Sequence, residues 1–376
     1  MVRFLHSADW QLGMTRHFLG AEAQSRFTAA RIEAIRTIGS LARAEDCSFV
    51  VVSGDVFETN HVERQVVVRS LEAMSATPSV TFYLLPGNHD PLDASSVFRS
   101  STFRDRRPAN VVVLDQPGRL AVAAGVELVA APWSSKRPLQ DLISAACVDL
   151  PVDGTTRILV GHGAVDRLSP DRHNPALIGL AELEAHLDSG QVHYVALGDR
   201  HSTTEVGLTG KVWYSGTPEP TDYTEVDPGN VLLVEASVDR TTVESRRVAG
   251  WRFVRRQFDL AGPADCDRLE AFMDSLPDKD RTIVKLALIG QLSLADKAHL
   301  DRLLAGHADL FAALETWDLR QDLVVLPDDT DFSELLLFGF AREALIDLRE
   351  LAAGGGDDVS ARDALGLLYR LGTVSK

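Results

Sequence analysis

The chain has 376 residues, a length that fits one large domain with one or two small ones. Its 45% hydrophobic and 24% charged residues are typical of a globular protein, and its apolar runs are too short to span a bilayer. The formal net charge of −16 argues against a general nucleic-acid-binding protein, because phosphate backbones favour a basic surface. Two features weaken this objection: part of the acidity can bind divalent cations, and arginines cluster at positions 104–107, 246–247 and 252–256.

The three cysteines, Cys47, Cys147 and Cys266, are far apart and odd in number. They form neither a disulfide framework nor a Cys-x-x-Cys metal knuckle, so we expect a reducing, cytoplasmic environment. The first residues enter a strand pattern without a long apolar core and a cleavage site, and we therefore expect no signal peptide.

The first 250 residues alternate short apolar runs with helical stretches, a pattern that predicts an α/β core. An amphipathic helix is expected over about residues 22–45. From residue 211 to 248 the pattern changes to consecutive strands, separated by turns rich in Pro, Gly and Asp. The buried strands are predicted at Phe49–Val52, Val80–Leu85, Ile158–Val160 and Tyr194–Leu197.

A domain boundary is predicted near Gly250, followed by a small α/β domain over residues 251–325 with a strand at 282–289 and a helix around 294–304. An acidic linker from residue 326 to 331 precedes two predicted helices, at about 332–352 and 361–371. Glycines at 354–356 end the first of them. The apolar faces of these helices can pack on their own chain or dock a partner, and the sequence leaves both possibilities open.

Small polar clusters follow the predicted strands. Side chains at the carboxyl ends of strands in an α/β sheet can converge, and two divalent cations need a bridging carboxylate and a shell of oxygen and nitrogen donors. A single Asp after a strand is usually a turn or cap residue, and a single buried His is usually structural. Five such clusters in chain order instead predict a dinuclear metal site: Ser7-Ala8-Asp9 with Gln11, Ser53-Gly54-Asp55, Pro86-Gly87-Asn88-His89, Gly161-His162, and Gly198-Asp199-Arg200-His201.

These clusters resemble the five sequence blocks of the calcineurin-like metallophosphoesterases. The residues around them, at Phe4–Gly13 and Tyr214–Pro218, are similar to the branch of bacterial SbcD-type DNA repair exonuclease subunits. The resemblance covers residues 1–248 well and the remainder in outline. It implies an α/β fold with a two-sheet sandwich flanked by helices (1–250), a small α/β capping domain (251–325) and C-terminal helices that dock a partner (326–376).

The resemblance also implies roles for single residues. The first metal would be held by Asp9, Gln11, Asp55 and His201, and the second by Asp55, Asn88, His162 and Asp199. His89 would be the catalytic residue that assists the leaving oxygen without binding metal. Gln11 and Asp199 stand where the family usually has histidines. Hard oxygen donors favour Mn²⁺, with Mg²⁺ as a second candidate, over Zn²⁺.

The function implied by the resemblance is a metal-dependent DNA exonuclease or endonuclease that hydrolyses phosphodiester bonds. We expect it to act in a DNA repair complex with an SbcC-like coiled-coil ATPase bound through the C-terminal helices, as a homodimer and without a membrane. Two alternatives remain: a phosphodiesterase or phosphatase acting on small nucleotides, and a weakly active interaction subunit.

Overall fold

The computed structural model describes residues 1–326, 338–353, 360–361, 364–365 and 368. The chain divides into two compact units, Met1–Arg252 and Phe253–Lys376. Within the described residues, no helix combines the length and the apolar character that a membrane span needs.

The first sheet of the first unit has six strands in the order β12-β11-β1-β2-β3-β4. Strands β1 to β4 run parallel to one another, and β11 and β12 are added antiparallel beside β1. The crossover connections between the parallel strands are helical, as this topology requires. The strands are β1 (Val2–Ser7), β2 (Phe49–Val52), β3 (Thr81–Leu84), β4 (Val111–Val113), β11 (Asn230–Ala236) and β12 (Thr241–Arg247), and the helices are α1 (Ala21–Ala44), α2 (Arg64–Ser75), the 3₁₀ helix η1 (Val97–Arg99) and α3 (Ser101–Arg106).

The second sheet also has six strands, in the order β5-β6-β7-β8-β10-β9. Its central strands β6, β7 and β8 are parallel, and β10 continues this direction beside β8. Its elements are β5 (Gly118–Ala123), β6 (Val126–Ala130), α4 (Leu142–Ala146), β7 (Thr156–His162), α5 (Leu180–Asp188), β8 (Tyr194–Gly198), β9 (Thr204–Val206) and β10 (Val212–Tyr214).

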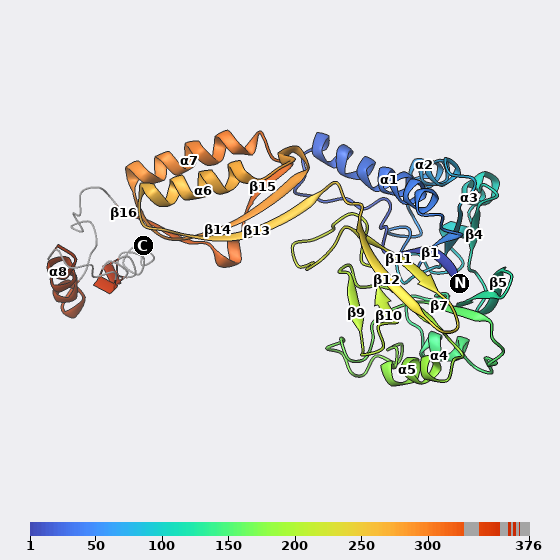
Figure 1. Ribbon diagram of the computed structural model, residues 1–376. Coiled ribbons are helices and arrows are strands. Elements are labelled where there is room, and N and C mark those ends of the chain that lie inside the picture. The colour runs from blue at the N-terminus through green and yellow to red at the C-terminus, as the bar shows by residue number, and fades with distance from the viewer. Residues whose placement is uncertain (327–337, 354–359, 362–363, 366–367, 369–376) are drawn as a thin grey trace. The chain divides into compact units, whose positions relative to one another are not determined.

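The two sheets pack face to face, and helices cover their outer faces (Figure 1). Alternation along β2 shows how the sequence builds these layers: Phe49 and Val51 point into the core between the sheets, whereas Val50 and Val52 pack on the helical side. Tyr194 on β8 belongs to the same inter-sheet core. The predicted fold class, a mixed α/β protein with two multi-stranded sheets flanked by helices, is confirmed.

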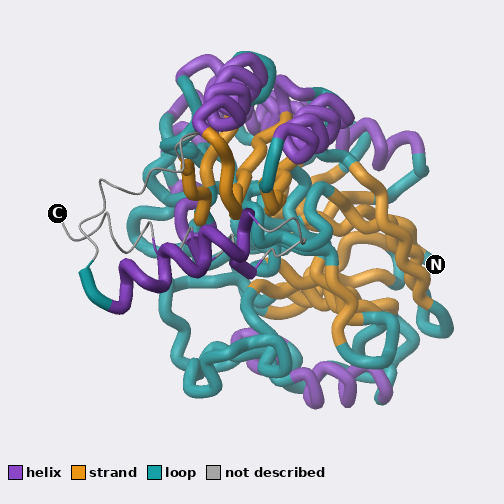
Figure 2. Tube along the Cα trace, turned by 90° about the vertical axis from the view of Figure 1, so that its left-hand side faces the viewer, coloured by secondary structure: helices purple, strands orange, loops and turns teal. Residues whose placement is uncertain are grey.

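The second unit is a smaller sheet in which β14 pairs with β13, β15 and β16. Helices α6 and α7 lie side by side on one face of this sheet (Figures 1 and 2). Its elements are β13 (Arg252–Leu260), α6 (Pro263–Ser275), η2 (Lys279–Arg281), β14 (Thr282–Ser293), α7 (Leu294–Ala308), β15 (Ala313–Thr316), η3 (Asp318–Arg320), β16 (Asp322–Leu326) and α8 (Phe340–Ala353).

The larger differences from the predicted element boundaries lie in the second unit. Strand β14 continues past Ile289 to Ser293, because residues Ile289–Ser293 pair in parallel with β16, and Leu326 ends β16 instead of opening a linker. Helix α7 continues to Ala308. The predicted helix start at 332 and most of the predicted helix at 361–371 lie outside the described residues.

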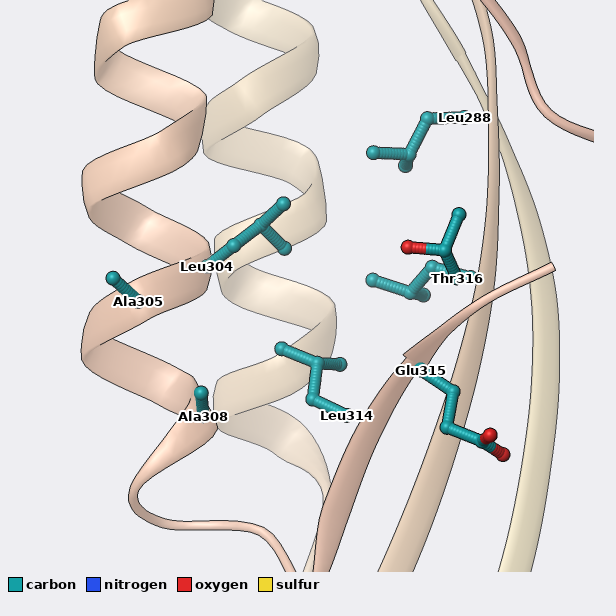
Figure 3. Close-up of a pocket in the computed structure, with 8 residues that line it drawn as sticks. Leu288, Leu304, Ala305, Ala308, Leu314, Glu315 and Thr316 are labelled. Atoms are coloured by element: carbon teal, nitrogen blue, oxygen red, sulfur yellow. The ribbon is translucent and has the colours of Figure 1, made fainter. Parts of the chain in front are cut away.

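A pocket of about 260 Å³ lies in the second unit between α7 and strands β14 and β15 (Figure 3). Its lining is mainly apolar and contains none of the residues predicted to bind metal. The lining residues are Leu286, Leu288, Leu304, Ala305, Ala308, Leu314, Glu315 and Thr316.

Candidate metal centre

The predicted ligands come from the carboxyl ends of strands in both sheets of the first unit. Asp9, Asp55 and Asn88 follow β1, β2 and β3, which are neighbours in the first sheet. His162 is the last residue of β7, and His201 follows the neighbouring strand β8 closely. The topology therefore delivers donors from two sheets to adjacent strand ends, where sites of α/β proteins gather.

Four of the predicted ligands have a left-handed backbone, which is uncommon for residues other than glycine. Their φ angles are 53° for Asp9, 48° for Gln11, 52° for Asp55 and 102° for Asp199. Such a conformation costs about 1–3 kcal/mol and persists where the surroundings enforce it. Here the loops that follow β1 and β2 are joined by two hydrogen bonds: Asp9 N donates to Gly54 O (3.0 Å), and Gln11 N donates to Asp55 O (3.0 Å).

Two glycines of the sequence clusters allow the loops to approach closely. A Cβ on Gly54, whose φ is +94°, would collide with the His162 ring, and a Cβ on Gly198 would collide with the carbonyl oxygen of Ser53. Glycine is therefore required at both positions for the strand ends to meet.

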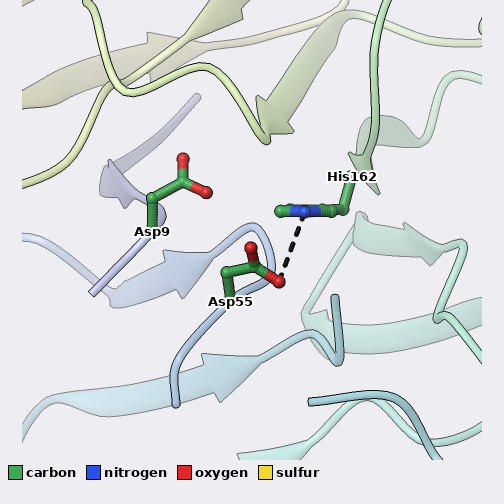
Figure 4. Close-up of side chains that lie close together, drawn as sticks. All are labelled: Asp9, Asp55 and His162. Carbon is green, nitrogen blue, oxygen red and sulfur yellow. Dashed lines mark ion pairs between the residues drawn. The ribbon is translucent and has the colours of Figure 1, made fainter. Parts of the chain in front are cut away.

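Asp9, Asp55 and His162 form a buried group in which one ligand atom of each residue lies within 4.8 Å of the others (Figure 4). His162 Nδ1 lies 2.8 Å from Ser53 O, so this nitrogen must donate. In the neutral ring the lone pair is then on Nε2, which faces Asn88 Oδ1 at 2.6 Å and Asp55 Oδ1 at 3.4 Å. Such contacts need a donor or a cation: the ring carries a second proton, Asn88 presents its amide nitrogen, or a metal ion takes the electron pair.

Gln11 is also incompletely satisfied by the protein. Its Nε2 donates to Asp55 Oδ2 (3.1 Å), whereas its buried Oε1 has no partner among the described residues. The side chain is only 1% exposed, and an unpaired buried acceptor is unfavourable. The leftover carbonyl oxygen fits a nearby cation, so the donor set of this chain fits the metal ions that the sequence predicted.

The ionisation of the centre reflects its burial. Burial raises the pKa of Asp9 to about 7, and it raises the pKa of Asp199. Burial acts in the same direction on Asp55, but the adjacent His162 outweighs it and lowers the pKa of Asp55. At His162 burial lowers the pKa, but the nearby Asp55 carboxylate outweighs this effect and raises the pKa well above its ordinary value. The buried carboxylates are therefore unfavourable as isolated negative charges, and bound divalent cations would stabilise them.

The remaining predicted ligands lie next to this group. The backbone N–H of Asp199 donates to both carboxylate oxygens of Asp9 (3.1 and 3.2 Å), and Asp199 Oδ1 lies 3.8 Å from His162 Nε2. His201 has its Nδ1 2.9 Å from Glu225 Oε1 and 2.8 Å from Thr221 Oγ1. Burial opposes a charge on this ring, but the hydrogen bond to Glu225 raises the pKa of His201.

Glu225 is a site residue that the sequence prediction missed. It lies in the irregular segment between β10 and β11, beyond the last sequence cluster, and no apolar periodicity or ligand spacing marks it. Its link to His201 follows only from the way the segment folds back over the strand ends.

His89, the predicted catalytic residue, lies beside the acidic group. Its backbone N–H donates to Asp55 Oδ1 (2.9 Å), and its ring donates from Nδ1 to Glu58 O (2.9 Å). The other ring nitrogen lies 3.9 Å from Asp55 Oδ2, and the side chain is 40% exposed. The ring is therefore fixed through Nδ1 and remains partly exposed.

This arrangement has a counterpart among known proteins. Residues 2–203, more than half of the chain, match the family model described as calcineurin-like phosphoesterase. The chain belongs to the calcineurin-like phosphoesterases. Membership of this metallophosphoesterase family implies a hydrolase that acts on phosphoesters with divalent metal ions.

Two curated relatives of this phosphoesterase carry the name of the D subunit of the SbcCD nuclease. The protein of Rhodobacter capsulatus is 31% identical over 94 residues, which are 24% of this chain and 22% of the relative. The protein of Bacillus subtilis is 26% identical over 149 residues, which are 38% of this chain and 37% of the relative. The matches therefore span about a fifth and about a third of the relatives' lengths. A solved structure of TT1561 of Thermus thermophilus aligns with 66% of this chain and 99% of its own, with a TM-score of 0.42 and 10% identity.

Proposed function

We propose that this phosphoesterase is a DNA exonuclease or endonuclease that hydrolyses phosphodiester bonds with two divalent metal ions. The observation that carries the proposal is the buried convergence of Asp9, Asp55 and His162 at the strand ends. Bound divalent cations would supply a deprotonated water as nucleophile and would offset charge on the phosphoryl oxygens.

Each residue of the centre has a role in this proposal. Asp55 would be the ligand shared by both metal ions, because its Oδ2 lies 3.1 Å from Gln11 Nε2 and its Oδ1 lies 3.4 Å from His162 Nε2. Asp9, Gln11 and His201 would complete the ligands of the first metal ion, and Asn88, His162 and Asp199 those of the second. Because hard oxygen donors predominate, Mn²⁺ is the expected metal, and Mg²⁺ is the alternative.

His89 is the proposed general acid. Since its Nδ1 is committed to Glu58 O, only Nε2 is left to face a substrate, and the side chain is 40% exposed. A protonated His89 would donate from Nε2 to the leaving alkoxide oxygen, the atom that gains negative charge as the phosphodiester bond breaks.

Two features favour DNA as the substrate. Both curated relatives are named as parts of a nuclease, which supports a nuclease over a small-nucleotide phosphatase. In addition, a separate unit with its own core follows the metallophosphoesterase unit and offers further surface for a large substrate. The alternative, a phosphodiesterase acting on small nucleotides, would use the same donor set.

The deciding experiment incubates the purified full chain with Mn²⁺, Mg²⁺, Zn²⁺ or a chelator on end-labelled duplex DNA, single-stranded DNA and a small chromogenic phosphodiester. Asp55→Asn serves as the inactive control. DNA cleavage that requires metal and is lost in Asp55→Asn is expected. Turnover of the small phosphodiester with intact DNA would replace the nuclease by the small-molecule enzyme, and inactivity on all substrates would leave the interaction subunit.

We also propose that residues 326–376 dock a coiled-coil ATPase in a cytoplasmic repair complex that contains two copies of this chain. Helix α8 supports this proposal because three of its large apolar side chains are exposed: Phe340 is 85% exposed, Leu351 56% and Ile346 51%. Deleting residues 332–376 should leave a folded phosphoesterase that no longer copurifies with the ATPase. A truncated protein that unfolds would show that the segment packs on its own chain.

A further inference from the structure

A buried carboxylate stands behind one of the two histidine ligands. The side chain of Glu225 is 5% exposed, and its Oε1 lies 2.9 Å from His201 Nδ1. The carboxylate also accepts hydrogen bonds from the backbone N–H of Thr221 (2.9 Å to Oε2) and from the Thr221 hydroxyl group. Burial without such partners would be strongly unfavourable for a carboxylate, so this contact network accounts for its position.

The contact determines which nitrogen of His201 is available to a ligand. A carboxylate accepts hydrogen bonds and cannot donate them, so His201 Nδ1 must carry the hydrogen. In the neutral ring the lone pair is then on Nε2. Imidazole ligands bind metals through such a lone pair, and the hydrogen bond made by the other nitrogen fixes the tautomer and raises the basicity of the ligand.

We propose that Glu225 is a positioning residue, which holds His201 as the Nδ1–H tautomer and strengthens Nε2 as a metal ligand. The inference rests on the proposed metal-dependent function. Gln11 lies on the same side of the centre, and its amide oxygen is a weaker metal ligand than imidazole. A His201 polarised by the Glu225 carboxylate would offset the loss of metal affinity that Gln11 causes.

The segment that carries Glu225 is tied to the loop of the first ligands. Arg31, which is 3% exposed, donates to Trp10 O (3.1 Å) and to Pro220 O (3.0 Å). Arg16 Nε donates to Thr221 O (2.9 Å), and Thr217 Oγ1 donates to Asp9 O (2.8 Å). Glu225 is thus held in a frame that includes the loop of Asp9 and Gln11, as a positioning role requires.

The other histidine provides an internal contrast. His162 Nδ1 donates to a backbone carbonyl group, Ser53 O, at 2.8 Å. A carbonyl group fixes the same tautomer but carries no full negative charge. Loss of the Glu225 charge should therefore weaken metal binding on the His201 side and leave the His162 side unchanged.

The test uses Glu225→Ala, Glu225→Gln and the control Glu219→Gln. Glu219 is a suitable control because it is 3% exposed and lies in the same segment, but it accepts from the backbone of Gly250 (2.8 Å) and Trp251 (3.1 Å) instead of from His201. Long-range ¹H–¹⁵N spectra of the metal-free proteins report the tautomer of His201, and calorimetric titration with Mn²⁺ reports the affinity of each site.

At a pH above the raised pKa of His201, where the ring is neutral, we expect wild type to show the Nδ1–H tautomer and Glu225→Ala to show a mixture with Nε2–H. Metal affinity should fall by about 10–100-fold at one of the two sites in Glu225→Ala. Glu225→Gln keeps an acceptor oxygen, so it should retain the tautomer with a smaller loss of affinity, and Glu219→Gln should match wild type in both measurements.

An unchanged tautomer and unchanged affinities in Glu225→Ala would overturn the proposal. Equal losses at both sites together with a lower melting temperature in Glu225→Gln would also overturn it, since they would show a purely structural role. If wild type binds no divalent metal, the proposed function fails, and the spectra of the metal-free proteins still decide whether Glu225 sets the tautomer.

Discussion

The two histidines of the centre are held in different ways. His162 ends a central strand of the second sheet, and Ser53 O, Asn88 Oδ1 and Asp55 Oδ1 surround its ring at 2.8, 2.6 and 3.4 Å. His201 lies in the loop after β8, outside the tight group of Asp9, Asp55 and His162, and its ring is fixed by a carboxylate from a distant segment.

The difference shows two routes to a preorganised ligand. On the His162 side the backbone supplies the order, because glycines such as Gly54 let the strand ends pack against the ring. On the His201 side a side-chain contact supplies it. Backbone-determined sites depend little on any single neighbouring side chain, whereas a side-chain contact can be removed by one substitution.

The largest expected effect comes from a residue that belongs to neither side. His89→Ala should lower phosphodiester turnover by about 10²–10⁴-fold, the typical contribution of general acid–base catalysis. Both metal sites should stay intact, because the contact of position 89 with Asp55 Oδ1 is made by the backbone N–H, which alanine retains. Turnover measured at saturating Mn²⁺ and calorimetric metal titration check the two halves of this prediction.

His61→Ala is a matched control, since His61 is an exposed histidine of the same region with no proposed role. Turnover close to wild type in His89→Ala, or loss of both metals, would show that His89 is not the acid.

The comparison also shows which parts of the centre could be predicted from the sequence. Asp9, Asp55 and His162 were predictable because each follows or ends an apolar strand at a tight turn of small residues, so local pattern and strand-end geometry carry the information. Glu225 was not, because its contact with His201 joins two irregular segments. No periodicity in the chain encodes such a contact.

The same distinction holds for the fold. The parallel strands β2, β3, β7 and β8 were predicted because they are continuous apolar runs, as expected for strands buried on both faces. Strand β6 (Val126–Ala130), which is interrupted by Glu127, was not predicted. Strand β5 (Gly118–Ala123) was not, because most of its residues are exposed and it is an edge strand. The extension of β14 past Gly290, which has a φ of +120°, depends on pairing with β16, a partner more than 30 residues away.

A smaller effect is expected when each side is returned to the usual histidine. Gln11→His acts on the His201 side and Asp199→His on the His162 side. Each change replaces an oxygen donor by imidazole nitrogen, which favours Zn²⁺ and later transition metals over Mg²⁺. The double variant should bind Zn²⁺ about tenfold more tightly or better relative to Mg²⁺ than wild type, a difference of about 1.4 kcal/mol.

Titrating the single variants with each metal assigns the effect to a side. Gln11→His should give the larger gain, because Gln11 is the weaker of the two present donors. Equal affinities in wild type and double variant, or a wild type that holds Zn²⁺ tightly at both sites, would contradict the predicted preference for hard donors.

The smallest expected effect concerns proton binding by the metal-free protein. Burial raises the pKa of Asp9 and of Asp90 to about 7, and the carboxylates around His162 outweigh burial and raise its pKa. Each of these groups binds a proton more tightly in the folded than in the unfolded chain. Their stabilising contribution is therefore complete below the unfolded pKa values, about 4 for Asp and about 6.5 for His, and is lost as the pH rises through the folded values.

The melting temperature of the protein in chelator should accordingly fall by several degrees between pH 5 and pH 8, given about 2–4 °C per kcal/mol for a unit of this size. Asp55 has a lowered pKa and acts in the opposite sense, but its contribution is lost only in a more acidic range.

Added Mn²⁺ should reverse the trend, because metal and protons compete for the same donors and metal binding strengthens as the pH rises. Asp90→Asn removes one of the raised groups outside the proposed ligands. Its melting temperature should therefore fall less steeply with pH in chelator than that of wild type. Thermal melts of both proteins across this pH range decide the matter: a melting temperature that rises with pH in chelator would show that the buried acids do not hold protons in the absence of metal.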